Sequence, residues 1–89
     1  LAALTASYRQ SLPGKADGLR AAFGAGNLEE VRALAHKLKG SAGMYGLPEV
    51  SEAAGKVEQA CRTGGPAVEV TPLLDELAAL CGGAAAGMG

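Results

Sequence analysis

Apolar residues recur every three or four positions along most of the chain and nowhere alternate with polar residues over a sustained run. This spacing matches the 3.6-residue period of an α-helix and not the two-residue period of a β-strand. Glycine-containing breaks interrupt the pattern at 24–27, 46–48 and 63–66. The pattern therefore predicts four helical segments joined by short connections.

The first segment is interrupted near its middle, because Pro13-Gly14 lies inside its apolar run. A proline within a helix removes one backbone hydrogen bond, and its ring clashes with the preceding turn. We therefore expect either a kink at Pro13 or two abutting helices. The apolar positions of this segment are Leu1, Leu4, Tyr8, Leu12, Ala16, Leu19 and Phe23.

The second segment carries clear signals for where a helix begins and ends. Asn27 is a favourable N-cap, and Glu30 follows three residues later as in a capping box. Gly46 is expected as the C-cap. Between them, apolar residues spaced three and four apart form one continuous seam that faces the core. The seam consists of Leu28, Val31, Ala35, Leu38, Ala42 and Tyr45.

Prolines also bear on the starts of the last two segments. Pro48 suits the first turn of the third helix, where a missing N–H costs little. The start of the fourth helix has two alternatives. Either Gly65-Pro66 begins the helix and Pro72 kinks it, or Thr71 caps it and Pro72 is its first residue. The expected seams are Leu47, Val50, Ala54, Val57 and Cys61 in the third helix, and Val70, Leu73, Leu74, Leu77, Leu80 and Cys81 in the fourth.

Short connections between amphipathic helices favour antiparallel neighbours. We therefore expect an all-α fold, an antiparallel up-down four-helix bundle over residues 1–81, followed by a flexible Gly/Ala tail over 82–89. The chain of 89 residues is short enough for a single domain.

Composition and charge exclude several classes of function. The formal net charge is -1 and the three aromatic residues are scattered, so nucleic-acid binding is not expected. No apolar run approaches the roughly 20 residues of a membrane helix, so no direct membrane contact is expected. The two cysteines and one histidine cannot complete a four-ligand zinc site of Cys and His. We expect Cys61 and Cys81 as free core thiols of a cytosolic protein, with a disulfide as the alternative.

The single histidine, His36, is predicted to face water. At about 100° per residue it points roughly 120–130° away from the core direction of the second helix. Arg32, Gly40 and Gly43 fall on the same strip, and Lys39 lies on its flank. An interior glycine costs about 0.5–1 kcal/mol relative to alanine. Two of them beside a histidine therefore indicate clearance for a partner, although close helix packing is the alternative reading.

These residue types suit the transient carriage of a phosphoryl group. A neutral imidazole is a nucleophile, and the Lys39 ammonium would neutralise charge on a group attached to the ring. The sequence has neither a nucleotide-binding glycine loop nor an acidic cluster for Mg²⁺, so no ATP-dependent kinase activity is expected. Lys37 is interpreted as solvated, and Ser41 as bonded back to a carbonyl one turn earlier.

The stretch "AHKLKGSAGMYG" at 35–46 resembles the signature of histidine-containing phosphotransfer (HPt) domains, His-x-Leu-Lys-Gly-Ser-Ala with a glycine following. The likeness covers roughly residues 8–62 and includes Val57-Glu58, where the family often has Leu-Glu. It implies a histidine phosphorylated on Nε2 that exchanges the group with an aspartate of a response-regulator receiver domain. By position, His36 is the phosphoacceptor, Lys39 the phosphate-side cation and Gly40 the access-giving residue. Arg32 and Gly43 are expected to contact the partner.

The resemblance also implies the partners, the metal ion and the cellular location of this reaction. The partners are a receiver domain and a hybrid sensor histidine kinase, and the receiver would supply Mg²⁺ because the chain holds no cofactor of its own. We expect a cytoplasmic monomer, either free or as a domain of a membrane-anchored sensor kinase. One alternative is a non-catalytic helical module that docks a receiver-like partner. Another is a histidine kinase dimerisation domain, which usually carries an acidic residue where Lys37 stands.

Overall fold

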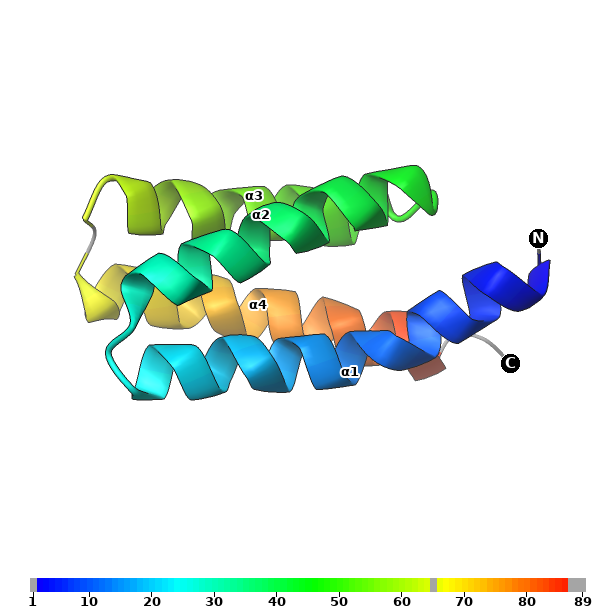
Figure 1. The fold of residues 1–89 in the computed structure, drawn as a ribbon, viewed down its shortest axis with the longest axis horizontal. Helices are drawn as coiled ribbons and strands as arrows, with labels where there is room; N and C mark the ends of the chain where they lie inside the picture. Colours follow the sequence, from blue (N-terminus) through cyan, green and yellow to red (C-terminus); the bar gives the residue numbers. More distant parts are fainter. Residues whose placement is uncertain (1, 65, 87–89) are drawn as a thin grey trace.

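Four helices pack side by side in the computed structural model, which describes residues 2–64 and 66–86, without the side chains of 2–4 and 67. They are α1 (Ala2–Gly24), α2 (Leu28–Met44), α3 (Pro48–Arg62) and α4 (Ala67–Ala86), and no strand occurs within the described residues. Each helix contacts its two neighbours in the closed order α1, α2, α3, α4, α1. Figure 1 shows the resulting antiparallel up-down bundle, 38 × 19 × 17 Å in extent, which confirms the predicted fold class.

The first helix runs through Pro13 as one element, so the prediction of two abutting helices is wrong. Its ribbon bends within the blue, N-terminal half in Figure 1. Leu12 and Ala16, on either side of the proline, are both buried in the core, while Pro13 itself is exposed. Packing of the flanking turns against the bundle therefore holds the helix together where one backbone hydrogen bond is missing.

The fourth helix starts at one of the two expected positions but ends later than expected. It begins at Ala67, directly after Pro66, and contains Pro72, so the first of the two alternative starts is confirmed. At the other end α4 continues through Gly82 and Gly83 to Ala86, where the sequence predicted a tail. Ala84 packs against the core, and α1 lies alongside α4. Packing therefore supports a glycine-rich last turn; residues 87–89 lie outside the described part.

Both ends of α2 follow the predicted capping chemistry, and the connection from α2 to α3 is short. Asn27 Oδ1 accepts a hydrogen bond from the Glu30 amide at 3.1 Å, as expected of an N-cap. Gly46 has φ +73°, the left-handed conformation that glycine adopts most readily after a helix end. The Leu47 amide then donates to the Ala42 carbonyl at 2.9 Å and closes the turn. This tight reversal places α3 directly against α2.

The core contains most of the predicted seam positions. Tyr45 is an exception: it is 36% exposed and stacks on Tyr8, with ring centroids 4.1 Å apart, instead of entering the core. Leu47 and Cys61 are half-buried at its edge. The core cluster consists of Leu12, Ala16, Leu19, Val31, Ala35, Leu38, Ala42, Val50, Ala53, Ala54, Val57, Leu74, Leu77 and Cys81.

Candidate functional site

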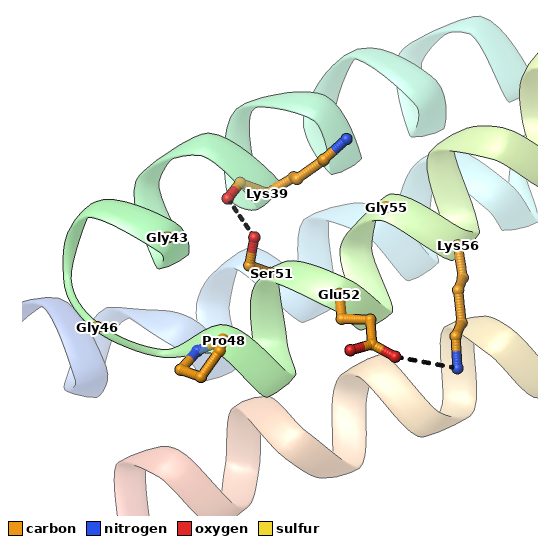
Figure 2. Close-up of a pocket in the computed structure, with 8 residues that line it drawn as sticks. All are labelled: Lys39, Gly43, Gly46, Pro48, Ser51, Glu52, Gly55 and Lys56. Carbon is orange, nitrogen blue, oxygen red and sulfur yellow. Dashed lines mark hydrogen bonds and ion pairs between the residues drawn. The ribbon is translucent and has the colours of Figure 1, made fainter.

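The histidine strip of α2 lies beside α3, and one hydrogen bond links the two helices near the turn that joins them. Ser51 Oγ donates to the Lys39 carbonyl oxygen at 2.8 Å, as Figure 2 shows. His36 lies three residues before Lys39 on α2, and the α3 residue that meets it lies seven residues beyond Ser51.

The residue opposite His36 is Glu58. His36 Nδ1 lies 2.8 Å from Glu58 Oε2, while 71% of the histidine side chain is exposed and only 9% of the glutamate side chain is. An ionised carboxylate can only accept, so Nδ1 carries the hydrogen and donates it. The neutral ring then has its lone pair on Nε2, the other nitrogen of an exposed ring. The predicted exposure of His36 is confirmed, and the ring is also held in one orientation.

The sequence predicts no role for Glu58, although it is the one charged residue buried among those that the structure describes. A signal was present in the spacing of α3. Ser51, Gly55 and Glu58 are four and three residues apart, which places them on one strip of a helix. A carboxylate next to the apolar seam position Val57 also needed a partner. That the partner is His36 follows only from how α2 and α3 pack.

Lys39 extends across α3 at Gly55. A Cβ atom at position 55 would lie 3.4 Å from Lys39 Cδ and 3.9 Å from Lys39 Nζ, so the lysine chain passes directly over this glycine. Figure 2 shows the side chain reaching toward the part of α3 that carries Gly55. No carboxylate of the described residues forms an ion pair with Lys39. The lysine one helical turn from His36 is thus a cation available to an incoming anion.

The two glycines of α2 occupy different surroundings. At Gly40 a Cβ would meet nothing within 4 Å, so the surface next to His36 is open, as predicted. At Gly43 a Cβ would lie 3.6 Å from Ser51 Oγ, so this exposed residue borders α3 as well as the open strip. Both glycines are exposed, as predicted, and Gly43 in addition lies next to the first turn of α3, which approaches α2 there.

A groove of about 620 Å³ runs between α2 and α3 on the side of Lys39 (Figure 2). The Lys56 ammonium in its wall lies 3.9 Å from Glu52 Oε1 and is partly neutralised by that carboxylate. Lys39 is the groove's other cation. The groove is lined by Lys39, Gly43, Gly46, Pro48, Ser51, Glu52, Gly55 and Lys56.

Arg32 lies on the other side of His36 along α2 and does not line this groove. It is half-buried and borders a separate cavity of about 300 Å³ with Cys61 and Arg62. Burial raises the pKa of the Cys61 thiol, and the nearby Arg32 charge offsets part of that rise. Cys61 and Cys81 are both free thiols, so the disulfide alternative is not realised.

Ser41 has the structural role that the sequence predicted. Its Oγ donates to the Leu38 carbonyl at 3.3 Å and lies 2.6 Å from the Tyr8 hydroxyl. Within residues 2–64 and 66–86, no three metal-ligating side chains gather into a site for a metal ion. No helix in that part of the chain combines the length and apolar character of a membrane span.

One comparison with known proteins gives a result for this chain. The family model described as Hpt domain matches residues 3–87, which is essentially the whole sequence. No curated protein and no solved structure gives a match.

Proposed function

Since the chain belongs to the Hpt domain family, we propose that His36 carries a phosphoryl group on Nε2. Hpt domains act in histidine phosphotransfer within two-component signalling, and they generally interact with receiver domains and histidine kinases. In this protein the group would be exchanged with an aspartate of a response-regulator receiver domain. The observation that carries the assignment is the hydrogen bond from His36 Nδ1 to Glu58, which leaves the lone pair on an exposed ring.

The chemistry is a direct transfer between two side chains. The Nε2 lone pair attacks the phosphorus of an aspartyl phosphate, a nitrogen–phosphorus bond forms, and the aspartate leaves as a carboxylate. The ring becomes cationic while Nδ1 keeps its hydrogen. Glu58 faces that cation and lowers the energy of the charged product. Return of the group to an aspartate follows the same path in reverse.

Lys39 is proposed to neutralise charge on the phosphoryl oxygens during transfer. Phosphoryl transfer depends mainly on positioning and charge stabilisation, and Lys39 is a cation one turn from His36 with no ion pair to a described residue. Gly40 leaves the approach to the ring unobstructed. We propose Arg32 and Gly43, on either side of His36 along α2, as partner contacts; Gly43 would make its contact through the groove.

The remaining components would come from other proteins. A hybrid sensor histidine kinase would supply the phosphoryl group by way of its receiver domain, and the receiver would bind the Mg²⁺. The domain is proposed to work as a monomer in the cytoplasm, without a cofactor of its own.

The test is labelling by two donors of different size. Phosphoramidate, a small molecule, and a phosphorylated receiver domain should each deposit an acid-labile phosphate on the wild-type chain. His36→Gln should abolish both labels while the helical signal in circular dichroism stays unchanged. Label that persists in His36→Gln would disprove the assignment. Receiver binding without any label would instead indicate a non-catalytic docking module.

A further inference from the structure

Another cavity, of about 380 Å³, lies at the start of α3, where it shares Gly46 and Pro48 with the Lys39 groove. Three helices border it: α1 through Arg9, the start of α3 through Leu47 and Val50, and the end of α4 through Leu80 and Ala84. Its volume falls within the range of small-molecule pockets, about 300–1,000 Å³. None of the residues assigned to phosphotransfer lines it.

Arg9 in the wall of this cavity has an unmet hydrogen-bonding need. Arg9 is half-buried, its covered Nε has no hydrogen-bond partner among the described residues, and no ion pair joins its guanidinium to any of them. Leaving a charged donor buried and unpartnered is costly, so native proteins rarely do so without an ion, a water or a ligand. The natural complement of a guanidinium is a carboxylate or a phosphate.

The start of α3 adds an independent reason for a negative charge here. Leu47 is the N-cap and provides no side-chain hydrogen bond to the helix. The first-turn amides of a helix have no acceptor inside it, and this end of the helix dipole is positive. Glu49, an exposed residue at the rim, opposes an anion with its own charge. That repulsion would be about twice as large for a dianion as for a monoanion.

Apart from Arg9 and Glu49, the side chains that line the cavity are apolar and suit a hydrocarbon body. Leu47, Val50, Leu80 and Ala84 border the cavity beside the arginine. We propose that this cavity binds a small organic monocarboxylate with a short hydrocarbon body. The carboxylate pairs with Arg9, and the hydrocarbon packs against Leu47 and Leu80. The site is separate from His36, and its test does not depend on the phosphotransfer assignment.

The test is an NMR titration of the full chain with sodium hexanoate. We expect saturable shifts at the amides of Arg9, Leu80 and Ala84. Hexanamide, which has the same shape without the charge, should bind about tenfold or more weakly, and so should acetate, which lacks the hydrocarbon. Equal binding of hexanoate and hexanamide, or the absence of saturable shifts, would overturn the proposal.

Two variants remove different halves of the site. Arg9→Met keeps the aliphatic stem and should weaken hexanoate binding about tenfold. Arg62→Met, which replaces an exposed arginine at the other end of α3, should leave the hexanoate affinity unchanged. Gly83→Leu should fill the cavity and block binding. Its matched control is Gly82→Leu, since both glycines have open space around them and only Gly83 lines the cavity.

If Arg9→Met does not fold, the comparison of Gly83→Leu with Gly82→Leu still tests the site. Glu49→Gln should tighten binding about twofold to threefold, because it removes the repulsion at the rim. Wild-type affinity in Arg9→Met or in Gly83→Leu would contradict the site.

Discussion

Glu58 is buried against α2 with its Oε2 atom 2.8 Å from His36 Nδ1, so the exposed imidazole of α2 is oriented by a carboxylate of α3. A buried carboxylate that pairs with one nitrogen of an imidazole fixes both the ring orientation and the position of its hydrogen. The availability of Nε2 therefore depends on a residue 22 positions away in the sequence.

Replacing Glu58 should slow transfer without preventing attachment of the phosphoryl group. In Glu58→Leu both the orienting bond and the balancing charge are lost, and we expect transfer from a receiver to slow about 10- to 100-fold. Glu58→Gln keeps an acceptor oxygen and should recover part of the rate. Stopped-flow or quench-flow transfer measurements would give these values. Glu76→Gln, which changes an exposed carboxylate of α4 outside the Lys39 groove, is the control and should react like wild type. Equal rates for Glu58→Leu and wild type would rule out a positioning role.

Lys39→Met should slow phosphotransfer with little effect on folding. The methionine keeps an apolar chain over Gly55 but removes the ammonium, and loss of one charge-assisted interaction corresponds to about a tenfold lower rate. Lys37→Met provides the matched control, since Lys37 lies on the α1 side of α2 and lines a different groove. If the two variants transferred at the same rate, Lys39 would have no role beyond solubility.

Gly40→Leu should hinder the approach of a receiver domain to His36 without changing the reactivity of the imidazole itself. Nothing lies within 4 Å of a Cβ at this position, so the fold accepts a side chain there, and the helix gains stability from the loss of an interior glycine, about 0.5–1 kcal/mol. We expect labelling by phosphoramidate to persist while transfer from a receiver domain falls about tenfold or more. Gly18→Leu on α1, also in open space, should gain similar stability and keep full transfer. Thermal unfolding and transfer rates together check this prediction.

The stability of the domain should decline at alkaline pH. Burial raises the pKa of Cys81, Cys61 and Tyr8 above their ordinary values of 9.0, 9.0 and 10.0. A raised pKa means that the folded chain favours the protonated form, so stability is full below the unfolded value and is lost as pH rises above it. The urea midpoint should therefore be flat from about pH 7 to 8.5 and fall above pH 9.

Cys81 is expected to contribute most of this loss among the thiols, because it is fully buried. Cys81→Ala should be less stable at neutral pH, since it leaves a small cavity, and should show a shallower decline above pH 9. Iodoacetamide should modify half-buried Cys61 before Cys81 under native conditions. A decline of unchanged steepness in Cys81→Ala would assign the alkaline transition to other groups.

The sequence by itself determined the features that depend on local periodicity and capping. Asn27 caps α2 and Gly46 takes the left-handed turn after it, because these roles need only neighbouring backbone groups. The outward direction of His36 follows from helical geometry and the apolar seam of the same helix. The identity of the site histidine was therefore available before any packing was known.

The tertiary structure decided which residues meet across helices. Glu58 faces His36, and Ser51 approaches Gly43, because the register of α3 on α2 is set by the packing of two surfaces far apart in the sequence. The continuity of α1 through Pro13 and the extension of α4 to Ala86 have a similar cause. Burial of neighbouring turns stabilises a helix where propensity alone predicts a break, and that energy comes from the whole bundle.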